Sequence, residues 1–211
     1  MIKSITIKST FKNWYRFYCK EQESLTIAFK SGVNVLVSQN GKGKTTFLNA
    51  IEEQVLNQEN QDSVELIGEL NPERPNMFFF SVKDMNPELM MFKINPMKQS
   101  ASGESAFWVS RNMLSHGQST NELMEDIEEI VINGTAGCII IDEPEIALDA
   151  TNMAKLIALL DKLKDKAQFI LVSHHPWLVL NRNFNVINFV KDFDYQAEMM
   201  QQTKKLKLLG E

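Results

Sequence analysis

The stretch "SQNGKGKTT", residues 38–46, has the composition and spacing of a loop that binds phosphate groups. It matches the pattern G-x-x-x-x-G-K-[ST], with Ser38 at the place of the first glycine. Its two glycines allow backbone N–H groups to approach phosphate oxygens closely. We expect Lys44 to reach the β- and γ-phosphates and Thr45 to coordinate Mg²⁺. The predicted nucleotide-binding residues are Ser38, Gln39, Asn40, Gly41, Lys42, Gly43, Lys44, Thr45 and Thr46.

The segments that flank this loop have the periodicities needed to position it. The β-branched run "VNVLV", residues 33–37, predicts a strand that leads into the loop. From Lys44 onward, apolar residues recur with helical spacing, so a helix would aim its N-terminal dipole at the bound anion. The alternative, a glycine-rich turn beside a solvated lysine, explains the loop but not the strand and helix around it.

A second segment with candidate catalytic residues, "CIIIDEPEIALD", covers residues 138–149. Four apolar residues predict a buried strand that ends at Asp142, which we expect to hold Mg²⁺ through water. Glu143 lies just beyond the strand end, where a carboxylate can orient and deprotonate an attacking water. The alternative is an acidic strand-to-helix turn, because Asp and Glu also favour a helix N-terminus. The phosphate-binding loop earlier in the chain favours the catalytic interpretation.

Around these two segments, strand patterns alternate with helix patterns. This alternation predicts an α/β fold with a largely parallel sheet. The further expected strands are residues 2–7, 24–29, 77–82, 168–172 and 185–190. The further expected helices are marked by apolar residues within 123–131 and 153–163.

Composition sets the broad class of protein. The 211 residues suffice for one domain, and the net charge of −5 gives no overall attraction to nucleic acid. No apolar run approaches the ~20 residues of a transmembrane helix, and the N-terminus lacks a signal-peptide block, so we expect a soluble cytoplasmic protein without membrane insertion. The two cysteines have no zinc-type spacing, and Cys138 is expected to be a small buried residue in its strand.

Three segments then resemble ABC-type ATPases in sequence and in order. "LSHGQ", residues 114–118, resembles the LSGGQ signature, with His116 in place of a glycine. "DEPEIALD" resembles the Walker B and D-loop segment, which makes Asp149 the D-loop aspartate. "LVSHHP" resembles the switch-histidine segment, in which His174 matches the residue that contacts the γ-phosphate; an offset of one would select His175.

The resemblance implies a P-loop NTPase with the ABC ATPase head fold: a mostly parallel central sheet, an N-terminal antiparallel β part and a small helical subdomain. It implies ATP hydrolysis with Mg²⁺, in a homodimer that closes head to tail around two ATP molecules. Glu143 and His174 would be catalytic. The signature would contact the partner's ATP at the N-terminus of a helix expected to begin near Ser119. The implied signature residues are Ser115, His116, Gly117 and Gln118.

Among ABC-type proteins, the chain resembles the compact stand-alone ATPases of bacteria, plasmids and phages. These are related to the chromosome-maintenance (SMC), overcoming-lysogenization-defect (OLD) and RecF-like branch. We expect one domain over residues 1–211, with a helical subdomain at about 57–133 and a C-terminal tail at 191–211. The alternatives are a slowly hydrolysing, ATP-gated module that docks a protein effector or DNA in a repair or defence system, and the nucleotide-binding subunit of a transporter. The aromatic residues considered for stacking on adenine are Trp14, Tyr15, Phe17 and Tyr18.

Overall fold

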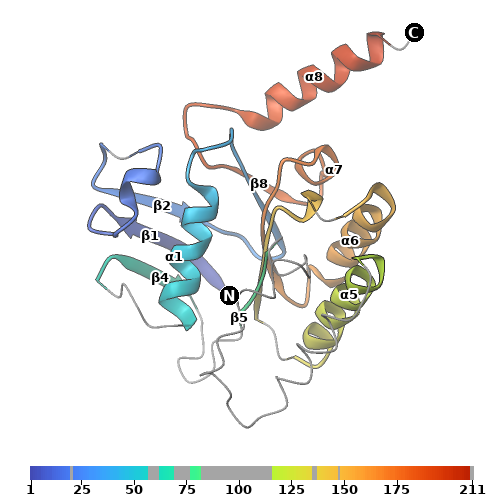
Figure 1. The fold of residues 1–211 in the computed structure, drawn as a ribbon, viewed down its shortest axis with the longest axis horizontal. Helices are drawn as coiled ribbons and strands as arrows, with labels where there is room; N and C mark the ends of the chain where they lie inside the picture. The colour runs from blue at the N-terminus through green and yellow to red at the C-terminus, as the bar shows by residue number, and fades with distance from the viewer. Residues whose placement is uncertain are drawn as a thin grey trace.

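A five-stranded parallel sheet forms the centre of the molecule (Figure 1). The computed structural model describes residues 1–19, 21–56, 62–68, 77–81, 116–134, 137–146 and 148–209. The sheet has the order β5-β6-β7-β3-β8, and each neighbouring pair is parallel. The predicted parallel sheet is therefore confirmed. Its strands are β3 (Val33–Val37), β5 (Met77–Ser81), β6 (Cys138–Asp142), β7 (Gln168–Val172) and β8 (Asn185–Asn188).

A second, antiparallel sheet lies on one side of the central sheet, as predicted for the N-terminal part. Its order is β2-β1-β4, from β1 (Ile2–Lys8), β2 (Ser24–Ala28) and β4 (Val64–Gly68). Helix α1 (Lys44–Leu56) packs between the two sheets, where Phe47 and Ile51 join one apolar core with residues of both (Figure 1). Strand β4 is not among the strands that the sequence predicted.

Helices cover the opposite face of the central sheet (Figure 1). They are α5 (His116–Ile132), α6 (Ala150–Leu163) and the short α7 (Pro176–Val179). Met153, Leu156, Leu160 and Leu163 of α6 are buried at helical spacing in a second apolar core. Because both faces are covered, β3 and β7 are buried along their whole length, which explains their mainly apolar sequences. Cys138 is also buried, as expected, and burial raises the pKa of its thiol to about 12.

Helix α5 begins at His116, three residues before the expected start near Ser119. The helical backbone continues back through Gly117, and helix ends are the part of an element that sequence patterns locate least well. Residues 57–61, 69–76 and 82–115, and with them Ser115 and most of the predicted helical subdomain, lie outside the described residues.

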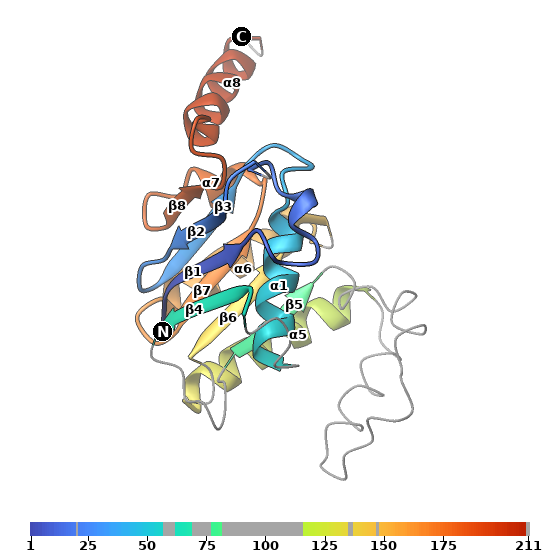
Figure 2. The ribbon, with the colours of Figure 1, turned by 90° about the vertical axis from the view of Figure 1, so that its left-hand side faces the viewer.

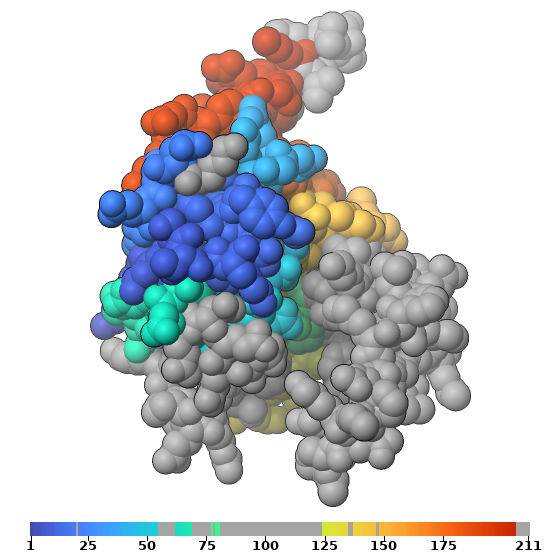
Figure 3. Space-filling view, turned by 60° about the vertical axis from the view of Figure 1, so that its left-hand side comes forward, coloured from blue at the N-terminus to red at the C-terminus, as the bar shows by residue number. Residues whose placement is uncertain are grey.

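The segment expected as a C-terminal tail contains helix α8 (Tyr195–Leu209). It starts at the edge of the central sheet and extends away from the body (Figures 1 and 2). In the space-filling view it rises above the N-terminal sheet (Figure 3). Within the described ranges, α8 and the other helices lack the length and apolar character that crossing a bilayer requires.

Candidate functional site

The strand order brings the three segments that carry predicted site residues to one edge of the sheet. Strand β7 lies between β3 and β6, and its Val172 is in register with both Leu36 and Asp142. The phosphate-binding loop follows β3, the two histidines follow β7, and Glu143 follows β6. Because the strands are parallel, all three segments emerge at their carboxyl ends, where α/β sheets bind ligands.

The loop between β3 and α1 has the backbone that phosphate binding requires. Gly41 and Gly43 have φ values of +74° and +98°. A Cβ on Gly43 would lie 2.9 Å from Cδ1 of Phe17 and 3.0 Å from the carbonyl oxygen of Arg16, so position 43 has no room for a side chain. Ser38 is buried, and among the described residues other than glycine only Glu143 has a positive φ. Serine therefore makes the turn without a left-handed backbone.

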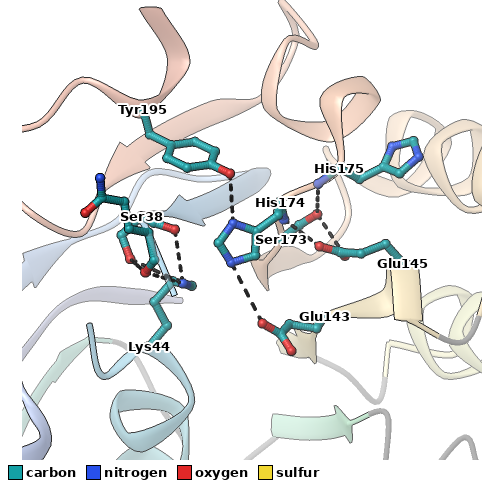
Figure 4. Close-up of polar contacts among 9 residues, drawn as sticks. Ser38, Lys44, Glu143, Glu145, Ser173, His174, His175 and Tyr195 are labelled. Atoms are coloured by element: carbon teal, nitrogen blue, oxygen red, sulfur yellow. Dashed lines mark hydrogen bonds and ion pairs between the residues drawn. The ribbon is translucent and has the colours of Figure 1, made fainter. Parts of the chain in front are cut away.

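The side chain of Lys44 is folded into this loop (Figure 4). It is only 5% exposed, and its Nζ donates to the Ser38 carbonyl and Ser38 Oγ, both at 3.2 Å, and to the Gln39 carbonyl at 3.1 Å. Burial lowers its pKa, while the nearby carboxylate of Glu143 opposes that change. The loop thus holds an ammonium group inside itself with neutral acceptors, which an anionic ligand can replace.

Asp142 and Thr45 form a pair of oxygen ligands suited to Mg²⁺. The Thr45 side chain hydrogen-bonds to Asp142, yet Oδ1 of Asp142 is buried without a hydrogen-bond partner. Burial, and then the charge of Glu143, raise the pKa of Asp142 to about 6. A bound cation would give Oδ1 of Asp142 a partner and would offset the repulsion between the charges of Asp142 and Glu143. Among the described residues no cluster of three or more His, Cys, Asp or Glu side chains is arranged to hold a metal.

Glu143 is held beside the loop by an unusual backbone. Its φ is +47°, and its N–H donates to the Val172 carbonyl at 2.9 Å. A left-handed conformation costs a non-glycine residue roughly 1–2 kcal/mol, and such strain concentrates at functional sites. The side chain lines a cavity of about 650 Å³ together with Tyr15, Arg16 and loop residues. The loop residues of the cavity are Asn40, Gly41, Gly43, Lys44, Thr45 and Thr46.

His174 points toward Glu143 (Figure 4). Its Nε2 is buried without a hydrogen-bond partner and lies 3.8 Å from Oε1 of Glu143, while its Nδ1 lies 3.0 Å from the hydroxyl of Tyr195. Burial, and then Lys44, lower the pKa of His174, so at neutral pH the contact with Glu143 is not an ion pair. His175 instead accepts from Trp177 N at 3.3 Å, caps α7 and points away. Of the two candidates, His174 is the one that faces Glu143.

Glu145 fixes the segment that carries His174. Its carboxylate accepts from Ser173 Oγ at 2.9 Å and from the backbone N–H of His174. Ser173 Oγ in turn accepts from the backbone N–H of His175 at 3.0 Å. The acidic segment after β6 is therefore bonded directly to the segment after β7. The motif comparison gave Glu145 and Tyr195 no structural role, because their contacts join segments that the sequence keeps apart.

Asp149 and three of the four aromatic candidates do not line this cavity. Asp149 caps α6, where its side chain accepts from Asn152 N at 2.8 Å. Residues 116–118 form the first turn of α5. Of the four aromatic candidates, Trp14 and Phe17 are buried in the core and Tyr18 packs against it. Tyr15 is 65% exposed and lines the cavity.

Comparisons with known proteins agree with this arrangement. Residues 10–53 match the family model described as an AAA domain. The structure is similar to the SMC head domain from Thermotoga maritima, with 14% identity and a TM-score of 0.54, over 90% of this chain and 96% of that one. It is also similar to cbiO1 from Clostridium perfringens, part of the ABC transporter complex cbiONQ, with 12% identity and a TM-score of 0.52, over 88% and 84% of the two chains. No curated protein matches by sequence. The chain thus has the P-loop fold of ABC-type ATPase heads, the fold of the SMC head.

Proposed function

We propose that this protein binds Mg·ATP in the cavity between the phosphate loop and Glu143 and hydrolyses its terminal phosphate. The observation that carries the proposal is the meeting of a buried lysine with two orphaned polar atoms at one sheet edge. Lys44 Nζ bonds only to uncharged acceptors, and Asp142 Oδ1 and His174 Nε2 have no hydrogen-bond partner. A phosphate group with a cation supplies a partner to each.

The roles follow from the placement of the groups. The loop N–H groups and Lys44 would hold the phosphates, at the N-terminus of α1. Thr45 and Asp142 would hold Mg²⁺, which neutralises phosphate charge when bound. Glu143 would orient the attacking water and accept its proton. His174 would donate from Nε2 to the terminal phosphate, and Tyr15 would stack on the base.

Calorimetry with Mg·ATP tests the binding half of this proposal. Lys44→Ala removes the charge inside the loop and should weaken binding about 10- to 100-fold, the worth of hydrogen bonds to a charged group. Lys30→Ala is the matched control, because Lys30 is an exposed lysine at the opposite edge of the same sheet. Equal affinity of wild type and folded Lys44→Ala would refute the assignment of the loop.

We further propose that two copies of this single-domain ATPase close head to tail, so that each site takes its signature from the partner. The support is the resemblance of "LSHGQ" to the ABC signature and the position of its residues 116–118 in the first turn of α5. Opening and closing with ATP would then drive or gate a protein effector or DNA. The signature residues and Asp149 would act across the interface.

Mixing two inactive variants tests the shared site. Ser115→Arg should bind ATP but fail to close, and Lys44→Ala should bind ATP too weakly to hydrolyse it at a concentration that saturates the wild type. Their heterodimer contains one site with both defects and one with an intact loop and an intact signature, so mixing should restore part of the ATPase rate. A Ser115→Arg protein that hydrolyses ATP normally would contradict the shared site.

A further inference from the structure

Tyr195 belongs to none of the recognised motifs, yet it contacts the histidine of the site. Its hydroxyl lies 3.0 Å from Nδ1 of His174, and the two rings meet edge to face at 5.5 Å (Figure 4). The tyrosine is itself fixed, because its backbone N–H donates to Asn188 Oδ1 at 3.0 Å at the end of β8. Gln196 Nε2 donates to the Val179 carbonyl at 2.9 Å, which ties the start of α8 to α7. The hydroxyl is therefore presented from a rigid support.

The surroundings determine which group donates the proton in this contact. A neutral imidazole carries one N–H, and Nε2 is the nitrogen that faces the carboxylate of Glu143, 3.8 Å away. An ionised carboxylate only accepts, so the proton is favoured on Nε2. Nδ1 is then an acceptor, and the Tyr195 hydroxyl is the donor. The charged groups that act on His174 are Lys44 from α1, Glu143 after β6 and Glu145 from the following turn.

The histidine also has space in which to turn. A cavity of about 350 Å³ adjoins its ring and is bounded by the loop residues Gln39 and Asn40 and by α8. Without a bond at Nδ1, a half-turn about the Cβ–Cγ bond would put a ring carbon in the place of each nitrogen and take Nε2 away from the site. The hydroxyl of Tyr195 is the side-chain group that holds Nδ1 in place.

We propose that Tyr195 is a positioning residue, which donates to Nδ1 of His174 and so presents Nε2–H to the terminal phosphate. The proposal rests on the ATPase function above. Because Tyr195 is the first residue of α8, this helix directly contacts the histidine proposed to bind the terminal phosphate. Tyr195 does not touch the reacting atoms, so its effect must pass through His174.

Kinetics of Tyr195→Phe test this dependence, since the variant removes only the hydroxyl. We expect kcat to fall about 3- to 10-fold, the worth of one neutral hydrogen bond, with KM for ATP unchanged. The double variant Tyr195→Phe/His174→Gln should be no slower than His174→Gln alone, because the tyrosine then has nothing to position. If the two effects multiply, Tyr195 acts elsewhere and the proposal is overturned. If His174→Gln alone has no effect, the error lies in the proposed role of His174.

Nitrogen NMR of the histidine rings tests the same contact without hydrolysis. The chain has three histidines, so the spectrum can be assigned with single His→Gln variants. In the wild type, Nδ1 of His174 should be unprotonated, and in Tyr195→Phe its signal should shift or broaden. His175, bonded to Trp177 N, is the internal control and should not change. A proton on Nδ1 of His174 in the wild type would overturn the proposal even if Tyr195→Phe failed to fold.

Discussion

Asp142→Asn should stabilise the ligand-free protein while it removes the proposed Mg²⁺ ligand. The pKa of Asp142 is raised from 3.8 to about 6 by burial and by Glu143. A carboxyl whose pKa is raised on folding stabilises the protein while it is protonated, and that stability is lost as the pH rises from about 4 through about 6. The difference between the two pKa values, about 2.2 units, corresponds to about 3 kcal/mol at about 1.4 kcal/mol per unit. Because the residue is only partly buried, we expect about 1–2 kcal/mol at pH 8.

Urea unfolding in EDTA, from pH 4 to pH 8, measures this effect. The asparagine keeps an acceptor for Thr45 and has no charge to bury, so Asp142→Asn should be the more stable protein at pH 8. Its advantage should shrink between about pH 6 and pH 4, as the wild-type carboxyl becomes protonated. Asp165→Asn, at an exposed aspartate, is the control and should change little. Equal midpoints at pH 8, or an advantage that grows on acidification, would refute the reasoning.

Three further substitutions test individual contacts of the site. Urea unfolding should show a free energy of unfolding roughly 1–3 kcal/mol lower for Gly43→Ala than for Gly41→Ala. Both glycines have positive φ, but only a Cβ on Gly43 meets Phe17, at 2.9 Å. Equal losses would contradict the close packing. Glu145→Ala should lower the free energy of unfolding by about 1–3 kcal/mol, since Ser173 Oγ and His174 N lose their acceptor. Glu145→Gln should lower the free energy of unfolding by less than Glu145→Ala does. Tyr15→Ala should weaken ATP binding in calorimetry about 10-fold, the worth of stacking on a base, whereas Tyr15→Phe should bind normally; if both variants bind equally, another group holds the base.

Local patterns predicted the parts of the site that depend on local structure. The loop after β3 needs an apolar strand, glycines at fixed offsets and a helix, and all three can be recognised in one short stretch of sequence. The apolar runs of β6 and β7 reveal strands buried on both faces. Such patterns do not give the order of strands, which places β7 between β3 and β6 and brings His174 near Glu143.

Contacts between distant segments lay beyond sequence reasoning. The choice between His174 and His175 required the path of the chain after β7, which turns one ring inward and uses the other as a cap. For Asp149 the sequence alone allowed two roles, since an aspartate before a helix fits an N-cap as well as a D-loop position. Tyr195 follows β8 in a polar stretch with no motif, so only the folded chain shows its contact with His174.

The central claim is hydrolysis of ATP with Glu143 as the base, and phosphate release tests it most directly. Wild type and Glu143→Gln should bind Mg·ATP with similar affinity, because the amide keeps the shape of the side chain. Turnover by Glu143→Gln should fall at least about 100-fold, the usual effect of losing a general base. Equal phosphate release by the two proteins, or none by a wild type that binds Mg·ATP, would contradict the account.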